Sequence, residues 1–170
     1  MKRLIVFRHA KAVPHGSAPD FDRALAPRGL GDAAATGQYL ADEQLFPDLA
    51  LVSPALRTRQ TWEQAARALG AVAVKLEPAI YEAATATLLK LVQGVDAQVR
   101  TLVLVGHNPG MGQLARDFVG HGDRYAFARL RSRFPTSAVA VLDFAVDGWG
   151  EVAQGGGRLD RFVTPGGEDD

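Results

Sequence analysis

The chain has 170 residues, of which 47% are hydrophobic and 22% are charged, and its 19 Lys and Arg balance its 19 Asp and Glu. This length and composition suit one globular domain over residues 1–170 and exclude a disordered, collagen-like or coiled-coil chain. Because the formal net charge is zero, no overall electrostatic attraction draws the chain to nucleic acid or acidic lipid. Any bound anion must therefore meet a local cluster of cations.

Cysteine is absent from the sequence. Its absence excludes disulfides, thiolate zinc sites, iron–sulfur clusters and catalysis by a cysteine nucleophile. The apolar run at the start is too short for the core of a signal peptide, and no later stretch approaches membrane-spanning length. We therefore expect a cytoplasmic protein with no nucleic-acid partner and no membrane partner.

The first two thirds of the chain alternate apolar runs with helix signals. Residues 3–7 form a β-branched and aromatic run, which favours a strand buried on both faces. Prolines among charged residues indicate a loop at 10–27, and a helix follows at 29–42. Further strands are expected at 49–52, 72–76 and 101–105, and further helices at 54–70, 86–99 and 109–119. Two of these helices follow a capping pair, Ser53-Pro54 and Asn108-Pro109.

The last third of the chain differs, because glycine-containing turns separate short apolar runs. Strands are expected at 138–144, 149–153 and 159–163, and the Gly-rich acidic tail at 164–170 is expected to fray. Since strands alternate with helices before this region, the predicted fold class is α/β, with three α/β/α layers. Its sheet should be mixed and mainly parallel, with a late antiparallel edge.

Polar residues follow each of the predicted parallel strands. In open α/β sheets, ligands bind beyond the carboxyl ends of the strands, where these residues should meet. The groups that follow the four strands in turn are Arg8-His9, Ser53 with Arg57, Tyr81-Glu82, and Gly106-His107. Two histidines, at least two arginines and a carboxylate beside two helix N-termini indicate a phosphate site.

Each of these residues also has a structural interpretation. A lone histidine at a strand end is more often a hydrogen-bonding residue than a catalyst, and His15 and His121 are expected to be structural. Ser53 is expected to cap a helix, because no G-x-S-x-G motif surrounds it. The P-loop, G-x-G-x-x-G and H-E-x-x-H motifs are absent, so we expect no metal and no cofactor.

Four motifs in order resemble the histidine phosphatase superfamily, whose fold is phosphoglycerate-mutase-like, and within it the SixA-type phosphohistidine phosphatases. The motifs are LIVFRHA at 4–10, the loop from Asp22 to Gly29, SPALRTRQT at 53–61 and VGHNP at 105–109. Ala10 stands where the superfamily usually has Gly, as it does in the SixA-type branch, and Ala24 stands where that branch usually has Pro. The resemblance extends over residues 4 to about 144.

Carried over to these positions, the resemblance implies that His9 is the nucleophile and that Arg8, Arg57 and His107 form the phosphate pocket. It assigns Arg28, in the loop motif, to substrate binding, and it places the superfamily's acid at Glu82. For His9 to attack phosphorus it must be neutral, with its other ring nitrogen donating to a backbone carbonyl. A bound phosphoryl dianion would raise the pKa of His107 and make it a cationic partner, while the arginines bind oxygens in bidentate fashion.

The resulting function hypothesis is a phosphatase that acts through phospho-His9 on phosphohistidine borne by a partner protein, such as a histidine phosphotransfer domain. The short chain leaves little sequence for a lid, and an open pocket favours a protein substrate. Two alternatives stay open. One is a phosphomonoesterase or mutase acting on a small phosphate ester, and the other is a non-catalytic module that binds phosphoproteins.

Overall fold

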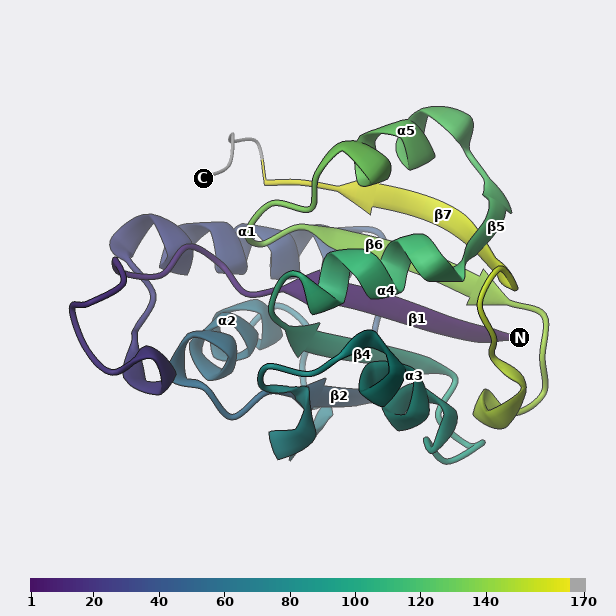
Figure 1. The fold of residues 1–170 in the computed structure, drawn as a ribbon, viewed down its shortest axis with the longest axis horizontal. Coiled ribbons are helices and arrows are strands. Elements are labelled where there is room, and N and C mark those ends of the chain that lie inside the picture. The colour runs from purple at the N-terminus through teal and green to yellow at the C-terminus, as the bar shows by residue number, and fades with distance from the viewer. Residues whose placement is uncertain (166–170) are drawn as a thin grey trace.

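The computed structural model describes residues 1–165 and contains a seven-stranded sheet in the order β3-β2-β4-β1-β6-β7-β5 (Figure 1). The strands are β1 Lys2–Arg8, β2 Leu49–Val52, β3 Ala73–Leu76, β4 Thr101–Gly106, β5 Val119–Gly122, β6 Val139–Phe144 and β7 Gly157–Val163. Strands β3, β2, β4 and β1 pair in parallel, β6 pairs antiparallel with both β1 and β7, and β5 is parallel to β7. The predicted fold class, a mainly parallel mixed sheet with antiparallel pairing late in the chain, is confirmed.

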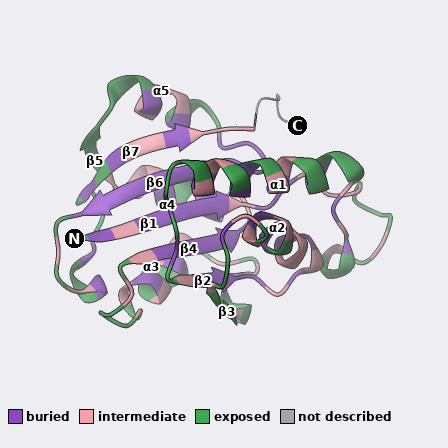
Figure 2. Cartoon of the chain, turned by 180° about the vertical axis from the view of Figure 1, so that it is seen from behind, coloured by how far each residue is buried: buried purple, intermediate pink, exposed green. Residues whose placement is uncertain are grey.

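Helices cover both faces of the sheet, as Figures 1 and 2 show from opposite sides. They are α1 Pro27–Asp42, α2 Leu56–Ala66, α3 Thr85–Gln93, α4 Gly110–Phe118 and α5 Arg124–Ser132. Alternate residues of β1 face two separate cores. Leu4 and Val6 pack in the core formed with α3, α4 and α5, while Ile5 and Phe7 pack in the core formed with α1 and α2. The strand is buried on both faces, as its uninterrupted apolar run predicts.

The last third of the chain is where the predicted elements are wrong or incomplete. The strand expected at 149–153 is a 3-10 turn, Trp149–Glu151. Trp149 and Val152 are each 1% exposed and belong to the core, so their hydrophobicity reflects burial from a loop. The indole of Trp149 donates to the carbonyl of Val99 at 2.7 Å. The tail expected to fray lies outside the described residues from 166 onward.

Two elements here were not predicted from the sequence. Strand β5 has the sequence VGHG, with three of its four residues exposed, and shows no apolar alternation. Helix α5 buries only Ala126 and Leu130, and its other apolar residues, Tyr125, Phe127 and Ala128, are exposed or partly exposed, which hides its period. Its N-cap, Asp123, accepts a hydrogen bond from the Ala126 amide at 2.7 Å. Elements with such weak sequence patterns form because they pack against neighbouring elements, and not because of local conformational preference.

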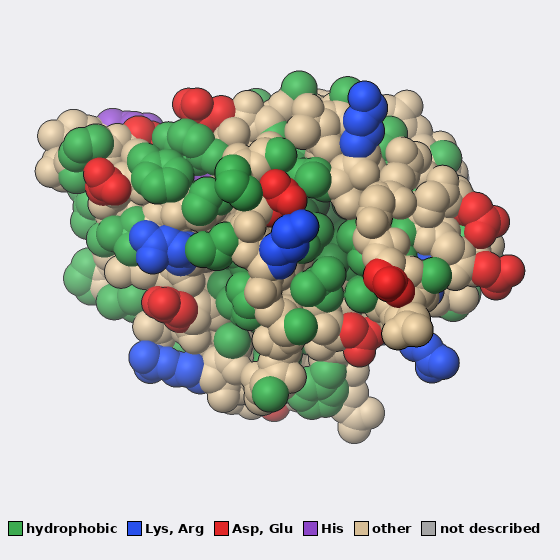
Figure 3. Space-filling model, turned by 90° about the horizontal axis from the view of Figure 1, so that it is seen from below, with side chains coloured by type: hydrophobic (Ala, Val, Ile, Leu, Met, Phe, Trp, Pro, Cys, Tyr) green, Lys and Arg blue, Asp and Glu red, His purple; other side chains and the backbone are tan. Residues whose placement is uncertain are grey.

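Strand β3 forms one edge of the sheet and pairs in parallel with β2. All four of its residues are exposed, including Val74 at 51% and Leu76 at 48%. A groove of about 290 Å³ runs between this edge and α3, and Leu49, Leu91 and Val95 are among its lining residues. Figure 3 shows this side of the molecule, where hydrophobic side chains lie among scattered charges of both signs.

Helices α1 and α2 cross so closely that one position admits only glycine. A Cβ atom on Gly37 would lie 2.2 Å from the backbone oxygen of Ala65. We expect Gly37→Ala to lower the free energy of unfolding by about 2 kcal/mol or more, because the backbones must separate. Gly31→Ala, on the same helix but with open space around it, should instead raise it by about 0.5–1 kcal/mol. Urea denaturation of both variants checks this, and equal midpoints would contradict the close crossing.

Candidate active site

The register of three parallel strands brings the predicted residues to one edge of the sheet. Arg8 pairs with Gly106 across β1 and β4, so the next residues, His9 and His107, leave adjacent strand ends. The amide of His9 donates to the Gly106 carbonyl at 3.0 Å, and the amide of Ser53, after β2, donates to the Val105 carbonyl at 3.1 Å. The convergence predicted from the strand ends is confirmed.

His9 is held in one orientation and in one tautomer. Its ring Nδ1 lies 2.7 Å from the carbonyl oxygen of Ala10. A carbonyl can only accept, so Nδ1 carries the proton and Nε2 keeps a free lone pair in the neutral ring. Burial lowers the pKa of His9 well below 6.5, opposed by the Ala10 hydrogen bond and assisted by the positive charges of Arg8 and Arg57. The ring is therefore neutral at pH 7, with Nε2 unprotonated.

His107 stands beside His9, with ring centroids 5.4 Å apart. Its Nε2 lies 2.8 Å from Ser53 Oγ. Burial and the positive charge of Arg57 lower the pKa of His107 to about 4, while Asp20 acts in the opposite direction. The protein's own groups thus keep His107 neutral at pH 7. The cationic form expected from the sequence depends on an added negative charge, such as that of a phosphoryl dianion.

Ser53 and Asn108 precede helices, but their roles differ. Helix α2 begins at Leu56 with Ala55 as its N-cap, so the predicted capping role of Ser53 is wrong. Ala55 is extended (φ −57°, ψ 147°), which delays the helix and leaves the Ser53 hydroxyl beside His107. The side chain of Asn108 does accept a hydrogen bond from the Gly112 amide in the first turn of α4, at 3.1 Å.

Arginines line the pocket from three separate segments. Arg8 extends from the end of β1 and donates to the Phe134 carbonyl at 3.1 Å. Arg57, in the first turn of α2, and Arg23, in the loop before α1, are both 6% exposed. Arg23 was not assigned a role from the sequence, although it lies inside the loop motif. Its position in that motif, directly after Asp22, is the sequence signal that could have identified Arg23.

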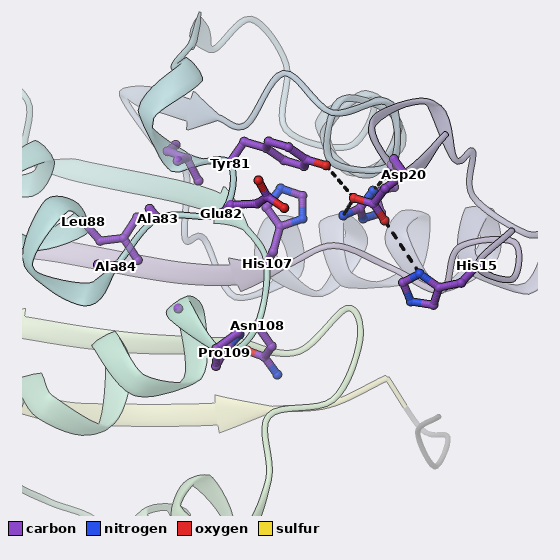
Figure 4. Close-up of a pocket in the computed structure, with 13 residues that line it drawn as sticks. His15, Asp20, Tyr81, Glu82, Ala83, Ala84, Leu88, His107, Asn108 and Pro109 are labelled. Carbon is purple, nitrogen blue, oxygen red and sulfur yellow. Dashed lines mark hydrogen bonds and ion pairs between the residues drawn. The ribbon is translucent and has the colours of Figure 1, made fainter. Parts of the chain in front are cut away.

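Asp20 binds several of these groups at once. Arg57 donates to its backbone oxygen at 2.7 Å and to its carboxylate at 3.1 Å. Arg23 donates to the same carboxylate at 3.1 Å and the hydroxyl of Tyr81 does so at 2.6 Å. The Tyr81 hydrogen bond, with the charge of Arg57, holds the pKa of Asp20 well below its usual range. Figure 4 shows Asp20 between Tyr81 and His15, whose Nδ1 is 3.8 Å away.

Two adjoining pockets open at this edge. The smaller, of about 380 Å³, is lined by residues that include His9, Arg8 and Arg23. The larger, of about 570 Å³, is lined by Tyr81, Glu82 and a group of apolar residues (Figure 4). Four residues line both pockets: His15, Arg57, His107 and Asn108. Arg57 Nε and His107 Nδ1 are buried without a hydrogen-bond partner in the described part of the chain.

Glu82 and Arg28, the other two residues assigned to the site from the sequence, lie in different parts of the structure. Glu82 is exposed, has a positive φ of 57° and lines the larger pocket beside His107. Arg28 lies on α1 and lines neither pocket. Its side chain is 44% exposed and its Nε donates to Asp32 at 3.2 Å, one helical turn further along. An intrahelical ion pair accounts for Arg28, and we leave it out of the proposed site.

Over residues 1–165, no group of three or more His, Asp and Glu is arranged to hold a metal ion. No described helix is long and apolar enough to cross a membrane.

The protonation of His107 can be followed by NMR of its imidazole ring. In the protein alone we expect its pKa near 4, because burial and Arg57 oppose protonation. Added inorganic phosphate should raise this pKa, because a bound anion stabilises the imidazolium. The ring of His121, exposed on β5, is the control and should not respond to phosphate. A His107 pKa that is unchanged by phosphate would contradict an anion site at this edge.

Fold and site together define an α/β protein that collects histidine and arginine at the carboxyl ends of parallel strands, the arrangement of a phosphoryl-binding enzyme. The model of one family, the histidine phosphatase superfamily (branch 1), matches residues 4–93. An uncharacterized protein of Mycobacterium tuberculosis is 38% identical over 161 residues, covering 93% of this chain and 99% of that protein.

Two solved structures share both the fold and part of the sequence. A candidate phosphohistidine phosphatase SixA from Nakamurella multipartitia has a TM-score of 0.86 and 30% identity, over 98% of this chain and 97% of that one. Another candidate SixA, from Agrobacterium tumefaciens, has a TM-score of 0.81 and 34% identity, over 96% and 98%. The chain therefore belongs to the histidine phosphatase superfamily, is a phosphatase, and resembles the SixA-type branch, as its motifs predicted.

Proposed function

We propose that this phosphatase works through a phosphorylated His9 and that its substrate is phosphohistidine on a partner protein. The observation that supports this best is the anchoring of His9. Its Nδ1 is fixed on the Ala10 carbonyl at 2.7 Å, and the ring lines the pocket that also contains Arg8, Arg23 and Arg57. A neutral imidazole with a free Nε2 lone pair among guanidinium groups suits in-line attack on a phosphoryl group.

In the first step, the Nε2 lone pair of His9 forms a bond to phosphorus while the bond from phosphorus to the leaving nitrogen breaks. The leaving ring takes that electron pair, and the proton on its other nitrogen lets it depart as neutral imidazole. The arginines and His107 bind the phosphoryl oxygens as charge redistributes. Water then attacks phospho-His9, inorganic phosphate leaves, and the electron pair of the broken bond restores neutral His9.

The similarity to candidate SixA phosphohistidine phosphatases supports this substrate. So does the position of Arg8 at the end of β1 and of His9 directly after it, in a pocket where exposed residues such as Pro14 and His15 form the rim. A phosphohistidine on a folded partner can reach such a rim.

The direct test compares substrates. The purified protein is incubated with a phosphorylated histidine phosphotransfer domain and, separately, with a panel of small phosphate esters, and phosphate release is measured. We expect the highest kcat/KM with the phosphorylated domain. Faster hydrolysis of one ester would support the small-molecule phosphomonoesterase, an isomerised ester would support a mutase, and binding without any release would support a non-catalytic module.

Glu82 is proposed to be the proton donor when the substrate is an ester. An alkoxide is a poor leaving group at neutral pH, so general acid catalysis should contribute about a hundredfold or more. A ring-protonated phosphohistidine leaves as imidazole, whose conjugate acid has a pKa near ~6.5, and needs little help. We therefore expect Glu82→Gln to slow hydrolysis of alkyl phosphates about a hundredfold and that of phosphohistidine much less.

Rates of this variant on both substrates check the assignment. Glu63→Gln is the matched control, because Glu63 is exposed on α2 and lines neither pocket. Equal losses on both substrates would count against phosphohistidine as the preferred substrate. No loss on either would make Glu82 a loop carboxylate with no part in proton transfer.

A further inference from the structure

The two pockets that meet at His107 differ in charge. The pocket that contains His9 is lined by four cationic side chains, and no carboxylate lines it in the described part of the chain. These cations are Arg8, Lys11, Arg23 and Arg57. The larger pocket shares Arg57 with it and adds two carboxylates, those of Asp20 and Glu82. The positive half of the site therefore surrounds the nucleophile, and the negative half lies beside it.

Asp20 offsets the charge that Arg57 brings to the larger pocket. Two nitrogens of the Arg57 guanidinium donate hydrogen bonds to Asp20, at 2.7 Å to its backbone oxygen and at 3.1 Å to its carboxylate. The hydroxyl of Tyr81 donates to the same carboxylate at 2.6 Å, which keeps it ionised and in place. Glu82 is left as a second carboxylate, and no cation of the described residues is ion-paired with it within 4.0 Å.

The rest of the larger pocket contains little that could bind an anion. Its remaining walls are mostly apolar, from Ile80, Ala83, Ala84, Leu88 and Pro109. Figure 4 shows Tyr81 and Glu82 on the side of His107 opposite to Pro109, with Asp20 further along toward His15. The basic groups that line it are Arg57, which is paired with Asp20 and shared with the pocket around His9, His107, which is likewise shared, and His15, whose Nδ1 is 3.8 Å from Asp20. A carboxylate or second phosphate placed here would therefore find no guanidinium or ammonium of its own, and burying it without a partner is costly.

We propose that the larger pocket receives the leaving group, and that Asp20 and Glu82 make it select leaving groups that are uncharged or cationic. This proposal rests on the proposed function, because it takes the pocket around His9 as the phosphoryl site. It fits an imidazole ring or a segment of a partner protein with basic side chains. It excludes, as good substrates, phosphate esters whose leaving group carries a carboxylate or another phosphate.

The size of the effect follows from Coulomb's law. A carboxylate that lies several ångströms from a charge on the leaving group, and is partly screened by water, changes the binding constant by about tenfold. We therefore expect a preference of about tenfold or more, in kcat/KM, for a cationic over an anionic leaving group. Salt should reduce this preference, because both charges are partly exposed to solvent.

The test uses two alkyl phosphates of similar size, choline phosphate and phosphoglycolate. The first has a cationic leaving group and the second an anionic one. We expect the wild-type enzyme to favour choline phosphate by about tenfold or more. Glu82→Gln should bring the ratio of the two kcat/KM values closer to one, and Glu82→Lys should favour phosphoglycolate. Since losing a proton donor slows both esters, only their ratio reports charge selection.

Glu63→Gln again serves as the control and should leave the ratio unchanged. If neither ester is hydrolysed, their dissociation constants, measured by calorimetry, are compared in the same way. A wild-type ratio near one, or a ratio that Glu82→Gln and Glu82→Lys do not alter, would overturn the proposal. That result is distinct from failure of the proposed function, which would show as no phosphate release from any substrate, the phosphorylated domain included.

Discussion

His9→Ala is expected to abolish phosphatase activity, with a loss of at least about a thousandfold in kcat, because it removes the atom that attacks phosphorus. The fold should survive the change. His9 lies at a pocket wall after the end of β1, and its ring bonds only to the adjacent Ala10 carbonyl among the hydrogen bonds described. Circular dichroism and the thermal midpoint should therefore stay close to those of the wild type.

A labelling experiment can identify the proposed phospho-His9 intermediate directly. Enzyme mixed with a substrate carrying a labelled phosphoryl group and then denatured in alkali should carry the label on His9, because a phosphorus–nitrogen bond survives alkali. His121→Ala, an exposed change remote from both pockets, should retain full activity and labelling. Label on Ser53 or on no residue, or more than a few per cent of the activity in His9→Ala, would contradict the covalent mechanism.

Arg57→Ala is expected to reduce kcat/KM by about a hundredfold or more, and Arg57→Lys should restore only a small part of it. Two of the five N–H donors of Arg57 are used on Asp20, which leaves three for phosphoryl oxygens. A lysine supplies a point charge but cannot bond Asp20 and two phosphoryl oxygens in a fixed plane. The loss is therefore geometric as well as electrostatic.

Steady-state kinetics of both variants check this, with Arg59→Lys as the matched control. Arg59 lies on the same helix, donates its Nε to the Pro54 carbonyl at 2.9 Å and lines neither pocket. It should keep wild-type activity. Full activity in Arg57→Lys would mean that a charge alone suffices at this position and that the planar arrangement with Asp20 has no role in binding phosphate.

The strands and helices that carry strong local patterns were predictable from the sequence. The run at residues 4–7 is apolar throughout because both faces of β1 are covered there, and the same holds for residues 102–105 of β4. Elements with weak patterns were not predictable. Strand β5 and helix α5 bury few side chains, and the buried Trp149 occurs in a turn whose hydrophobicity resembles that of a strand. A hydrophobic residue can be buried from a strand, a helix or a turn, so hydrophobicity alone does not identify the type of element.

In the site, the sequence by itself determined the residues attached to strand ends: Arg8, His9, His107 and, one helical turn beyond β2, Arg57. Parallel strands in register must deliver such residues to one edge, so chain order is enough to place them together. From the sequence, Arg28 was assigned to substrate binding and Arg23 was given no role, although both lie in one loop motif. Only the tertiary structure distinguished them, because it buries Arg23 beside Asp20 and leaves Arg28 on the solvent side of α1.

The charge arrangement of the larger pocket was likewise decided by the tertiary structure. Asp20 contacts Tyr81, 61 residues away in the sequence, and Arg57, 37 residues away. No local sequence pattern around residue 20 predicts either contact. The position of a loop residue depends on long-range packing, whereas the position of a strand end follows from backbone hydrogen bonding between neighbouring strands. His9, the proposed nucleophile, its arginines and Glu82 could therefore be read from the sequence, while the position of Asp20 in the larger pocket required the folded chain.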